Sequence, residues 1–255
     1  TGKILNSRFI SMMLLWYHSS FEYIQLRNRM NCILFGGSGE VGGAVALELL
    51  KSDVCSKLTM LGRRALDSMQ DKAMVEQVIV DTGSPDFEAI VKEVAQGHDI
   101  GISCIGIGSG TTWMSEEQMI EVEVNMLGKY ARGCKASGIE VFELLTAVGI
   151  NETHADSRIK GFRVMGKKYK AVLDVGFDKL AVFKPGMIVG NVHTPRWLTV
   201  LTHIIPDSIG WGNIRQEEVA QAFVAHLEKR VAMQKEPVVS YGNKEMKLLI
   251  SKTYR

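Results

Sequence analysis

Short apolar runs alternate with stretches of helical periodicity through most of the chain. Such continuous runs are typical of strands buried on both faces, whereas apolar residues three and four positions apart predict amphipathic helices. Strands alternating with helices imply right-handed crossovers and a parallel, doubly wound α/β sheet of the Rossmann-like type. We expect strands at residues 32–35, 58–61, 78–80, 100–105, 141–145 and 182–186.

A glycine-rich turn joins the first apolar run to the first helical stretch in the sequence ILFGGSGEVGG. Gly36 allows a sharp turn, Gly39 leaves no side chain between the backbone and a pyrophosphate, and Gly42 allows close helix packing. Free backbone N–H groups and the helix dipole then face an anion. The alternative is an ordinary glycine-rich connection, but a GxSxG nucleophile elbow is excluded because Glu40 occupies a required glycine position. The predicted cofactor contacts are Gly36, Ser38, Gly39, Glu40, Val41 and Gly42.

Two arginines follow the second expected strand, where a dinucleotide fold meets the adenosine ribose. An acidic side chain there would bind the 2′-hydroxyl group, whereas Arg63 and Arg64 can donate charge-assisted hydrogen bonds to a 2′-phosphate. The pair therefore favours NADP(H) over NAD(H). A solvated loop is the alternative interpretation of these two residues.

The ends of the later strands add further candidates for the same edge of the sheet. Asp81 is placed either to reach the adenine ring or to form a turn at the strand end. Gly106 begins a glycine-rich exit that would let the backbone pass beside the diphosphate, or that is a flexible loop. Thr146 follows the fifth strand.

Capping signals predict where several helices begin. The helix starts that we expect are Ser84 with Pro85 at the first helical position, Ser115 with Gln118 in a capping box, and Asn213 with Gln216. A basic stretch at residues 160–173 predicts an amphipathic helix whose cationic face is either solvated or in contact with an anion or a protein. We interpret His226 as a packing residue and His193 as a loop residue.

Length and composition fit one α/β domain with an appended lobe. We expect an extension at residues 1–30, a dinucleotide-binding domain at 31–186 and a C-terminal substrate lobe at 187–255 that is integrated with it. The formal net charge of +2 argues against general attraction to nucleic acid or membrane. The four cysteines have no metal-ligand spacing, so we predict no metal site and reduced thiols in the cytoplasm.

Several motifs in their order along the chain resemble the atypical short-chain dehydrogenase/reductase family, in particular an NADPH-binding, tumour-suppressor-like type. The motifs are ILFGGSGEVGG, KLTMLGRR, GHDIGISCIG, ELLTAVG, AVFKPG and VSYGNKEM. The resemblance implies a Rossmann fold, bound NADP(H) and a small substrate lobe. It also implies that the backbone at Pro185 packs beside the nicotinamide.

The resemblance implies an incomplete catalytic set. Active members use a Ser or Thr after the fifth strand and a Tyr-x-x-x-Lys motif on the next helix, where the lysine lowers the tyrosine pKa. These tyrosine and lysine positions hold Gly161 and Met165 here, and no tyrosine is followed by lysine four residues later. Thr146 and Tyr169 are the remaining catalytic candidates, with Lys167 or Lys170 as a partner for the tyrosine.

Two functions of different classes remain. The first is an NADP(H)-dependent hydride transfer between nicotinamide and an unknown carbonyl or alcohol substrate. The second is a non-catalytic NADPH-binding regulator that acts through a protein partner. The glycine turn predicts a bound cofactor for both functions. The missing tyrosine and lysine matter only for hydride transfer, so on mechanism their absence favours the regulator.

Overall fold

A seven-stranded, fully parallel sheet forms the centre of the computed structural model, which describes residues 29–107, 114–189, 212–229 and 231–253. The strand order is β3-β2-β1-β4-β5-β6-β9, which is the order of a doubly wound dinucleotide-binding sheet. The predicted fold class is therefore confirmed. The strands are β1 (Met30–Phe35), β2 (Cys55–Gly62), β3 (Val75–Ile79), β4 (Ile100–Ser103), β5 (Val141–Leu145), β6 (Lys179–Phe183) and β9 (Val238–Tyr241). A separate two-stranded parallel sheet pairs β7 (Met187–Val189) with β8 (Asn213–Arg215).

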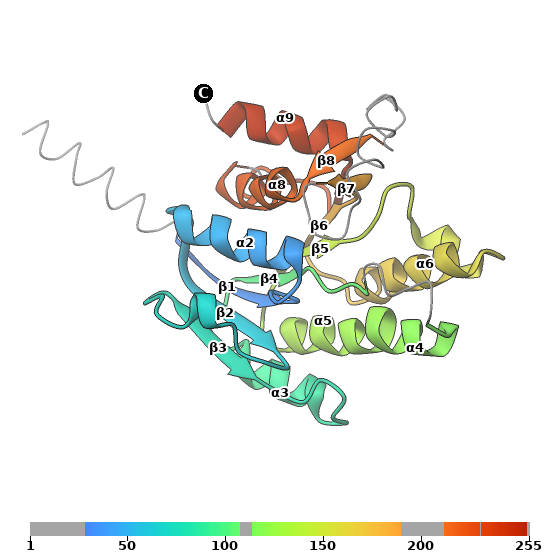
Figure 1. Cartoon of the computed structure of the whole chain (residues 1–255), viewed down its shortest axis with the longest axis horizontal. Helices are drawn as coiled ribbons and strands as arrows, with labels where there is room; N and C mark the ends of the chain where they lie inside the picture. The colour runs from blue at the N-terminus through green and yellow to red at the C-terminus, as the bar shows by residue number, and fades with distance from the viewer. Residues whose placement is uncertain (1–28, 108–113, 190–211, 230, 254–255) are drawn as a thin grey trace, which may run out of the picture.

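Helices cover both faces of the large sheet (Figure 1). On one face lie α2 (Glu40–Lys51), α8 (Gln216–Lys229) and α9 (Asn243–Thr253). On the other face lie α3 (Phe87–Val94), α5 (Leu127–Ala136) and α6 (Lys160–Leu173). Shorter helical segments are η1 (Asp67–Met69), α4 (Glu116–Ile120), the π-helical segment η3 (Glu121–Met126) and η4 (Glu152–Asp156).

Each face of the sheet has its own apolar core, which explains why the strands are continuous apolar runs rather than alternating ones. Leu34 of β1 points into one core and Phe35 into the other. In the second core the Tyr130 hydroxyl donates a 2.8 Å hydrogen bond to the Ile33 carbonyl. The four cysteines are buried free thiols.

A buried polar pair joins the sheet to α8. His226 Nδ1 lies 2.7 Å from Glu143 Oε1, and both side chains are fully buried. Burial raises the pKa of the Glu143 carboxyl group, and the neighbouring His226 opposes that shift. The interpretation of His226 as a packing residue is therefore confirmed, although this hydrogen bond to a strand 83 residues away was not foreseen.

Some predicted element boundaries were wrong. The helix expected at Ser84 begins at Phe87, because Ser84 and Asp86 form a turn in which the Ser84 hydroxyl accepts from the Asp86 N–H group. Asn213 lies in β8 and not at a helix cap, since its segment pairs with β7. The capping box at Ser115 and Gln118 is confirmed.

Candidate functional site

The glycine turn runs directly from β1 into α2, as predicted. Gly36 has a backbone φ of +90°, and a Cβ atom there would lie 2.7 Å from the backbone of Cys104 and Ile105. A Cβ atom at Gly42 would collide with the Gly36 carbonyl oxygen. Both glycines are thus required by the close approach of α2 to β1 and of the turn to the end of β4.

A single methyl group at Gly42 is expected to destabilise the fold. Overpacking against backbone costs about 1–3 kcal/mol, so Gly42→Ala should lower the free energy of unfolding by that amount in urea titrations. Gly43→Ala is the matched control, because its Cβ atom would meet the nearest heavy atom at an ordinary 3.5 Å. Equal stability of the two variants would contradict this account of Gly42.

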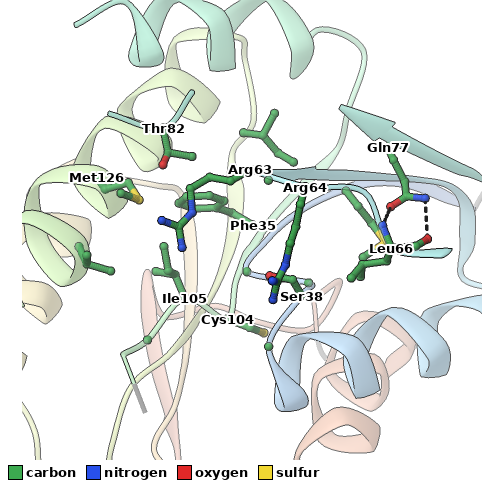
Figure 2. Close-up of a pocket in the computed structure, with 18 residues that line it drawn as sticks. Phe35, Ser38, Arg63, Arg64, Leu66, Gln77, Thr82, Cys104, Ile105 and Met126 are labelled. Atoms are coloured by element: carbon green, nitrogen blue, oxygen red, sulfur yellow. Dashed lines mark hydrogen bonds between the residues drawn. The ribbon is translucent and has the colours of Figure 1, made fainter. Parts of the chain in front are cut away.

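A cavity of about 290 Å³ opens beside the glycine turn (Figure 2). Residues from the ends of β1, β2 and β4 line it together with side chains of η3. The lining includes Gly36, Gly37, Ser38, Gly39, Arg63, Arg64, Leu66, Thr82, Ile105, Gly106 and Met126. The structure therefore brings together the glycine turn, both arginines and Gly106, as the sequence predicted for this edge of the sheet.

The two arginine side chains lie at different parts of this cavity. Arg64 extends toward Ser38 of the glycine turn, whereas Arg63 extends toward Ile105 and Met126 (Figure 2). The loop that follows them is fastened by Gln77, whose side-chain amide exchanges hydrogen bonds of 2.7 and 3.0 Å with the backbone of Leu66. The Arg64 guanidinium group can thus meet a phosphate that lies beside the glycine turn, whereas the Arg63 guanidinium group can meet one in the part of the cavity next to η3.

Other predicted cofactor contacts lie outside this cavity's lining. Asp81 accepts a 2.9 Å hydrogen bond from the Gly83 N–H group, which is the arrangement of a turn, and its neighbour Thr82 lines the cavity instead. Glu40 lines a different hollow between α2 and α8. Val41 packs against the apolar core, and Gly42 lies close to the backbone of Gly36 and Gly37 in the turn.

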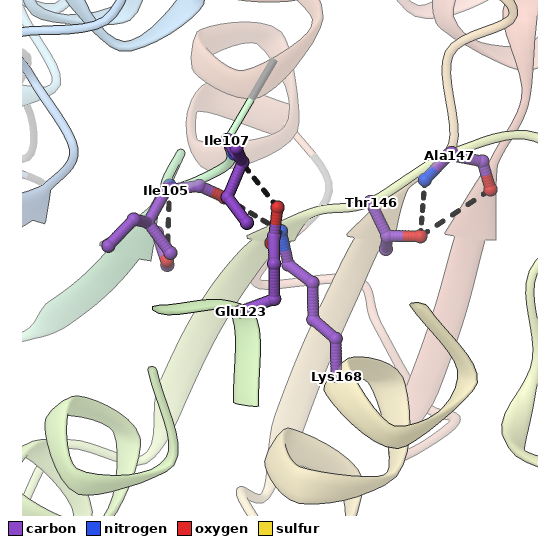
Figure 3. Close-up of polar contacts among 7 residues, drawn as sticks. Ile105, Ile107, Glu123, Thr146, Ala147 and Lys168 are labelled. Atoms are coloured by element: carbon purple, nitrogen blue, oxygen red, sulfur yellow. Dashed lines mark hydrogen bonds and ion pairs between the residues drawn. The ribbon is translucent and has the colours of Figure 1, made fainter. Parts of the chain in front are cut away.

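A buried ion pair between Lys168 and Glu123 binds the backbone of the segment that follows β4 (Figure 3). Lys168 Nζ of α6 lies 2.8 Å from Glu123 Oε2 of η3 and donates a 2.7 Å hydrogen bond to the Ile105 carbonyl. Glu123 Oε1 accepts a 2.8 Å hydrogen bond from the Ile107 N–H group. Only 3% of the Lys168 side chain and 5% of the Glu123 side chain is exposed. Lys168 therefore does not belong to a solvated face, although Arg163 of the same helix pairs with Glu116 nearer the surface.

A second cavity, of about 500 Å³, has Glu123 in its lining and is mostly apolar. It is bordered by α4, η3, α6 and the segments that leave β5 and β6. Gly161, Met165 and Pro185 are part of its lining. The two positions that correspond to the family's tyrosine and lysine therefore face a real hollow, and neither offers a proton donor.

Thr146 and Tyr169, the two catalytic candidates, are absent from the described lining of both cavities. The Thr146 hydroxyl lies against the N–H group of Ala147, the next residue (Figure 3). Tyr169 is 6% exposed, and burial raises the pKa of its phenol. Its cationic neighbour is Lys184, whose Nζ lies 4.7 Å from the ring centroid, whereas Lys170 pairs with Asp174.

Sequence reasoning missed several site residues. Gln77, Thr82 and Met126 have no motif that singles them out, since they reach the cavity from β3, from the turn after it and from η3. Glu123 and Lys168 are 45 residues apart and only the tertiary structure joins them. A charged residue within an otherwise apolar helical stripe was the one available signal for Glu123. The glycine-rich residues 108–110 and the loop around His193 lie outside the described residues.

Solved structures that resemble the chain are Rossmann-fold proteins of low sequence identity. A UDP-glucose-4-epimerase from Stenotrophomonas maltophila, with bound NAD and a formylated UDP-arabinopyranose, has a TM-score of 0.63 at 14% identity and covers 84% of this chain and 78% of its own. The oxidoreductase ylbE from Lactococcus lactis has a TM-score of 0.57 at 17% identity, covering 88% and 97%. These likenesses confirm the fold.

Relatives by sequence define the family, although no family model matches the chain. The mitochondrial protein FMP52 of Coccidioides immitis is 22% identical over 70% of this chain and 74% of its own length. In the described part of this chain, no helix has the length and apolar character to cross a membrane. Protein HTATIP2 of Rattus norvegicus is 30% identical over 237 residues, which are 91% of this chain and 90% of the relative. The chain belongs to the HTATIP2-like family of atypical short-chain dehydrogenase/reductase proteins with a Rossmann fold.

Proposed function

We propose that this protein binds NADP(H) and that cofactor binding, rather than hydride transfer, is its principal function. Cofactor binding is supported by one observation: the glycine turn, Arg63 and Arg64 line the same cavity (Figure 2). The turn offers backbone N–H groups to a diphosphate, and the arginines offer paired donors to a 2′-phosphate. The lining described for this cavity contains no carboxylate that would repel that phosphate.

Hydride transfer to a carbonyl carbon also needs a proton for the oxygen atom, so an active site requires a positioned donor. Gly161 and Met165 supply none, and the described lining of the apolar cavity contains no hydroxyl group. Tyr169 lies beneath Lys184 instead. These positions favour the regulatory alternative over the oxidoreductase.

A regulatory protein must pass its cofactor-bound state on to a partner. We propose that cofactor binding changes a surface that a protein partner recognises. The β4 exit is suited to this role, because Ile105 and Gly106 line the cofactor cavity and Ile107 is held by Glu123. The buried free thiols suit a reducing compartment, which supports the cytoplasm as the location.

Calorimetric titration of the native chain with NADPH and NADH tests the proposal. We expect saturable binding of NADPH and clearly weaker binding of NADH. NADPH oxidation should then stay at the background rate with a panel of aldehydes and ketones. Steady turnover that is lost in Tyr169→Phe would establish the oxidoreductase instead, and absence of NADPH binding would refute both functions.

A further inference from the structure

A groove extends along α2, next to the helix α8 that packs against it (Figure 1). Its volume of about 450 Å³ lies within the range of ligand sites. The segment around η1 and the first turns of α8 contribute to its lining. The α2 residues in the lining follow helical spacing and form one stripe from the first turn to the last: Glu40, Gly43, Ala44, Leu47, Glu48 and Lys51. We call this hollow the α2–α8 groove.

The middle of the α2–α8 groove presents an aliphatic side chain to solvent. Leu47 is 47% exposed. Gly43 and Ala44 lie one turn before it, and Ala220 of α8 also lines the groove, so small residues leave space beside the leucine. An exposed aliphatic side chain in a groove on a helix face is a typical anchor for the apolar face of a partner helix.

The ionisable groups of the groove are mostly acidic. The described lining contains three carboxylate groups, on Glu40, Glu48 and Glu217, and one ammonium group, on Lys51. Lys51 Nζ lies 3.0 Å from Glu48 Oε2, so this pair is neutral and the lining carries two more negative than positive charges. The whole chain has the opposite sign, with a formal net charge of +2. The groove therefore complements a cationic partner.

The groove and the cavity beside the glycine turn share part of their lining. Gly37, Ser38, Gly39 and Leu66 line both. A cofactor that binds the backbone N–H groups of the turn restricts these residues to one arrangement, which preorganises the adjoining wall of the groove. This wall is a different part of the lining from the β4 exit.

We propose that the α2–α8 groove binds a basic amphipathic helix of a partner protein. Its aliphatic side chains would contact Leu47, and its lysine or arginine side chains would face Glu40 and Glu217. A helix is favoured because the groove follows a stripe of three helical turns, which matches apolar anchors at positions i, i+3, i+4 and i+7. The proposal rests on the proposed function only for the effect of NADPH, since docking itself requires no cofactor.

Fluorescence polarisation of a labelled peptide tests the proposal on the full chain. The probe is an amphipathic peptide of leucine and lysine, about 14 residues long so that it covers the turns of α2, and its twin has glutamate in place of lysine. We expect the lysine peptide to bind about tenfold more tightly than the twin and to lose affinity as salt is added. Saturating NADPH should tighten its binding about threefold, because the shared turn is then already fixed.

Three variants locate the binding surface. Leu47→Arg should weaken binding of the lysine peptide roughly tenfold, because it removes the apolar anchor and adds a like charge. Leu248→Arg is the matched control, since Leu248 on α9 is 48% exposed and lies outside the groove lining, and it should leave binding unchanged. Glu217→Lys should weaken binding about fivefold and reduce its dependence on salt.

Equal binding of the two peptides, or equal losses in Leu47→Arg and Leu248→Arg, would overturn the proposal. Absence of peptide binding would overturn it too, and self-association that Leu47→Arg abolishes would then identify a second copy of this chain as the occupant. An affinity unchanged by NADPH would overturn the coupling through the glycine turn. NADPH titration of the same samples separates the two claims, because peptide binding without NADPH binding contradicts only the proposed function.

Discussion

Replacing both Arg63 and Arg64 with alanine is expected to weaken NADPH binding roughly 100-fold. A hydrogen bond to a charged group contributes about 1.5–3 kcal/mol, and two exposed arginines at the lower end of that range give about 3 kcal/mol. Both side chains line the cavity that contains the glycine turn. Calorimetric titration of the double variant measures the change directly.

Two controls make this result specific. NADH lacks the 2′-phosphate, so its affinity for the double variant should stay within about threefold of its affinity for the native chain. Arg132→Ala removes another exposed arginine, which pairs with Glu88 between α5 and α3, and should leave both cofactors unaffected. Equal losses for NADPH and NADH would mean that the arginines bind a part that both cofactors share.

The fold was predictable because its signals are local. The apolar run at β1, the glycine turn and the helical stripe of α2 lie within 22 consecutive residues, from Met30 to Lys51. Each of these elements constrains the next one. A strand that is buried on both faces needs crossover helices to cover it, and the glycine turn sets how closely α2 packs against β1. Strand boundaries were less accurate, because the edge strand β3 is partly exposed and its apolar pattern is weak.

The cavity beside the glycine turn was predictable in part for the same reason. Gly36 and Arg63 follow buried strands, and parallel strands end at one edge of the sheet. Thr82 was missed in favour of Asp81, because both residues lie in the turn after β3, where strand alternation no longer decides which side chain faces the cavity. The apolar cavity depends on contacts between α6 and η3, which no sequence spacing encodes.

Lys168→Met is expected to destabilise the protein by about 3–5 kcal/mol, which is the usual cost of removing one partner from a buried ion pair. Glu123 would keep its hydrogen bond from the Ile107 N–H group but would lose its counter-ion in a site where 5% of its side chain is exposed. For a chain of this length, that loss corresponds to a fall of roughly 10 °C in the thermal midpoint. Scanning calorimetry measures it.

Combining Glu123→Gln with Lys168→Met should recover most of the lost stability, because glutamine keeps an acceptor for Ile107 and removes the unpaired charge. Lys170→Met tests whether any lysine of α6 would have the same effect. Its pair with Asp174 is more than half exposed on both sides, and exposed pairs contribute about 0–1 kcal/mol. A single Lys168→Met variant as stable as Lys170→Met would show that water reaches Glu123. In that case the Glu123–Lys168 pair would not be a dry ion pair, and the usual cost of breaking a buried pair would not apply to it.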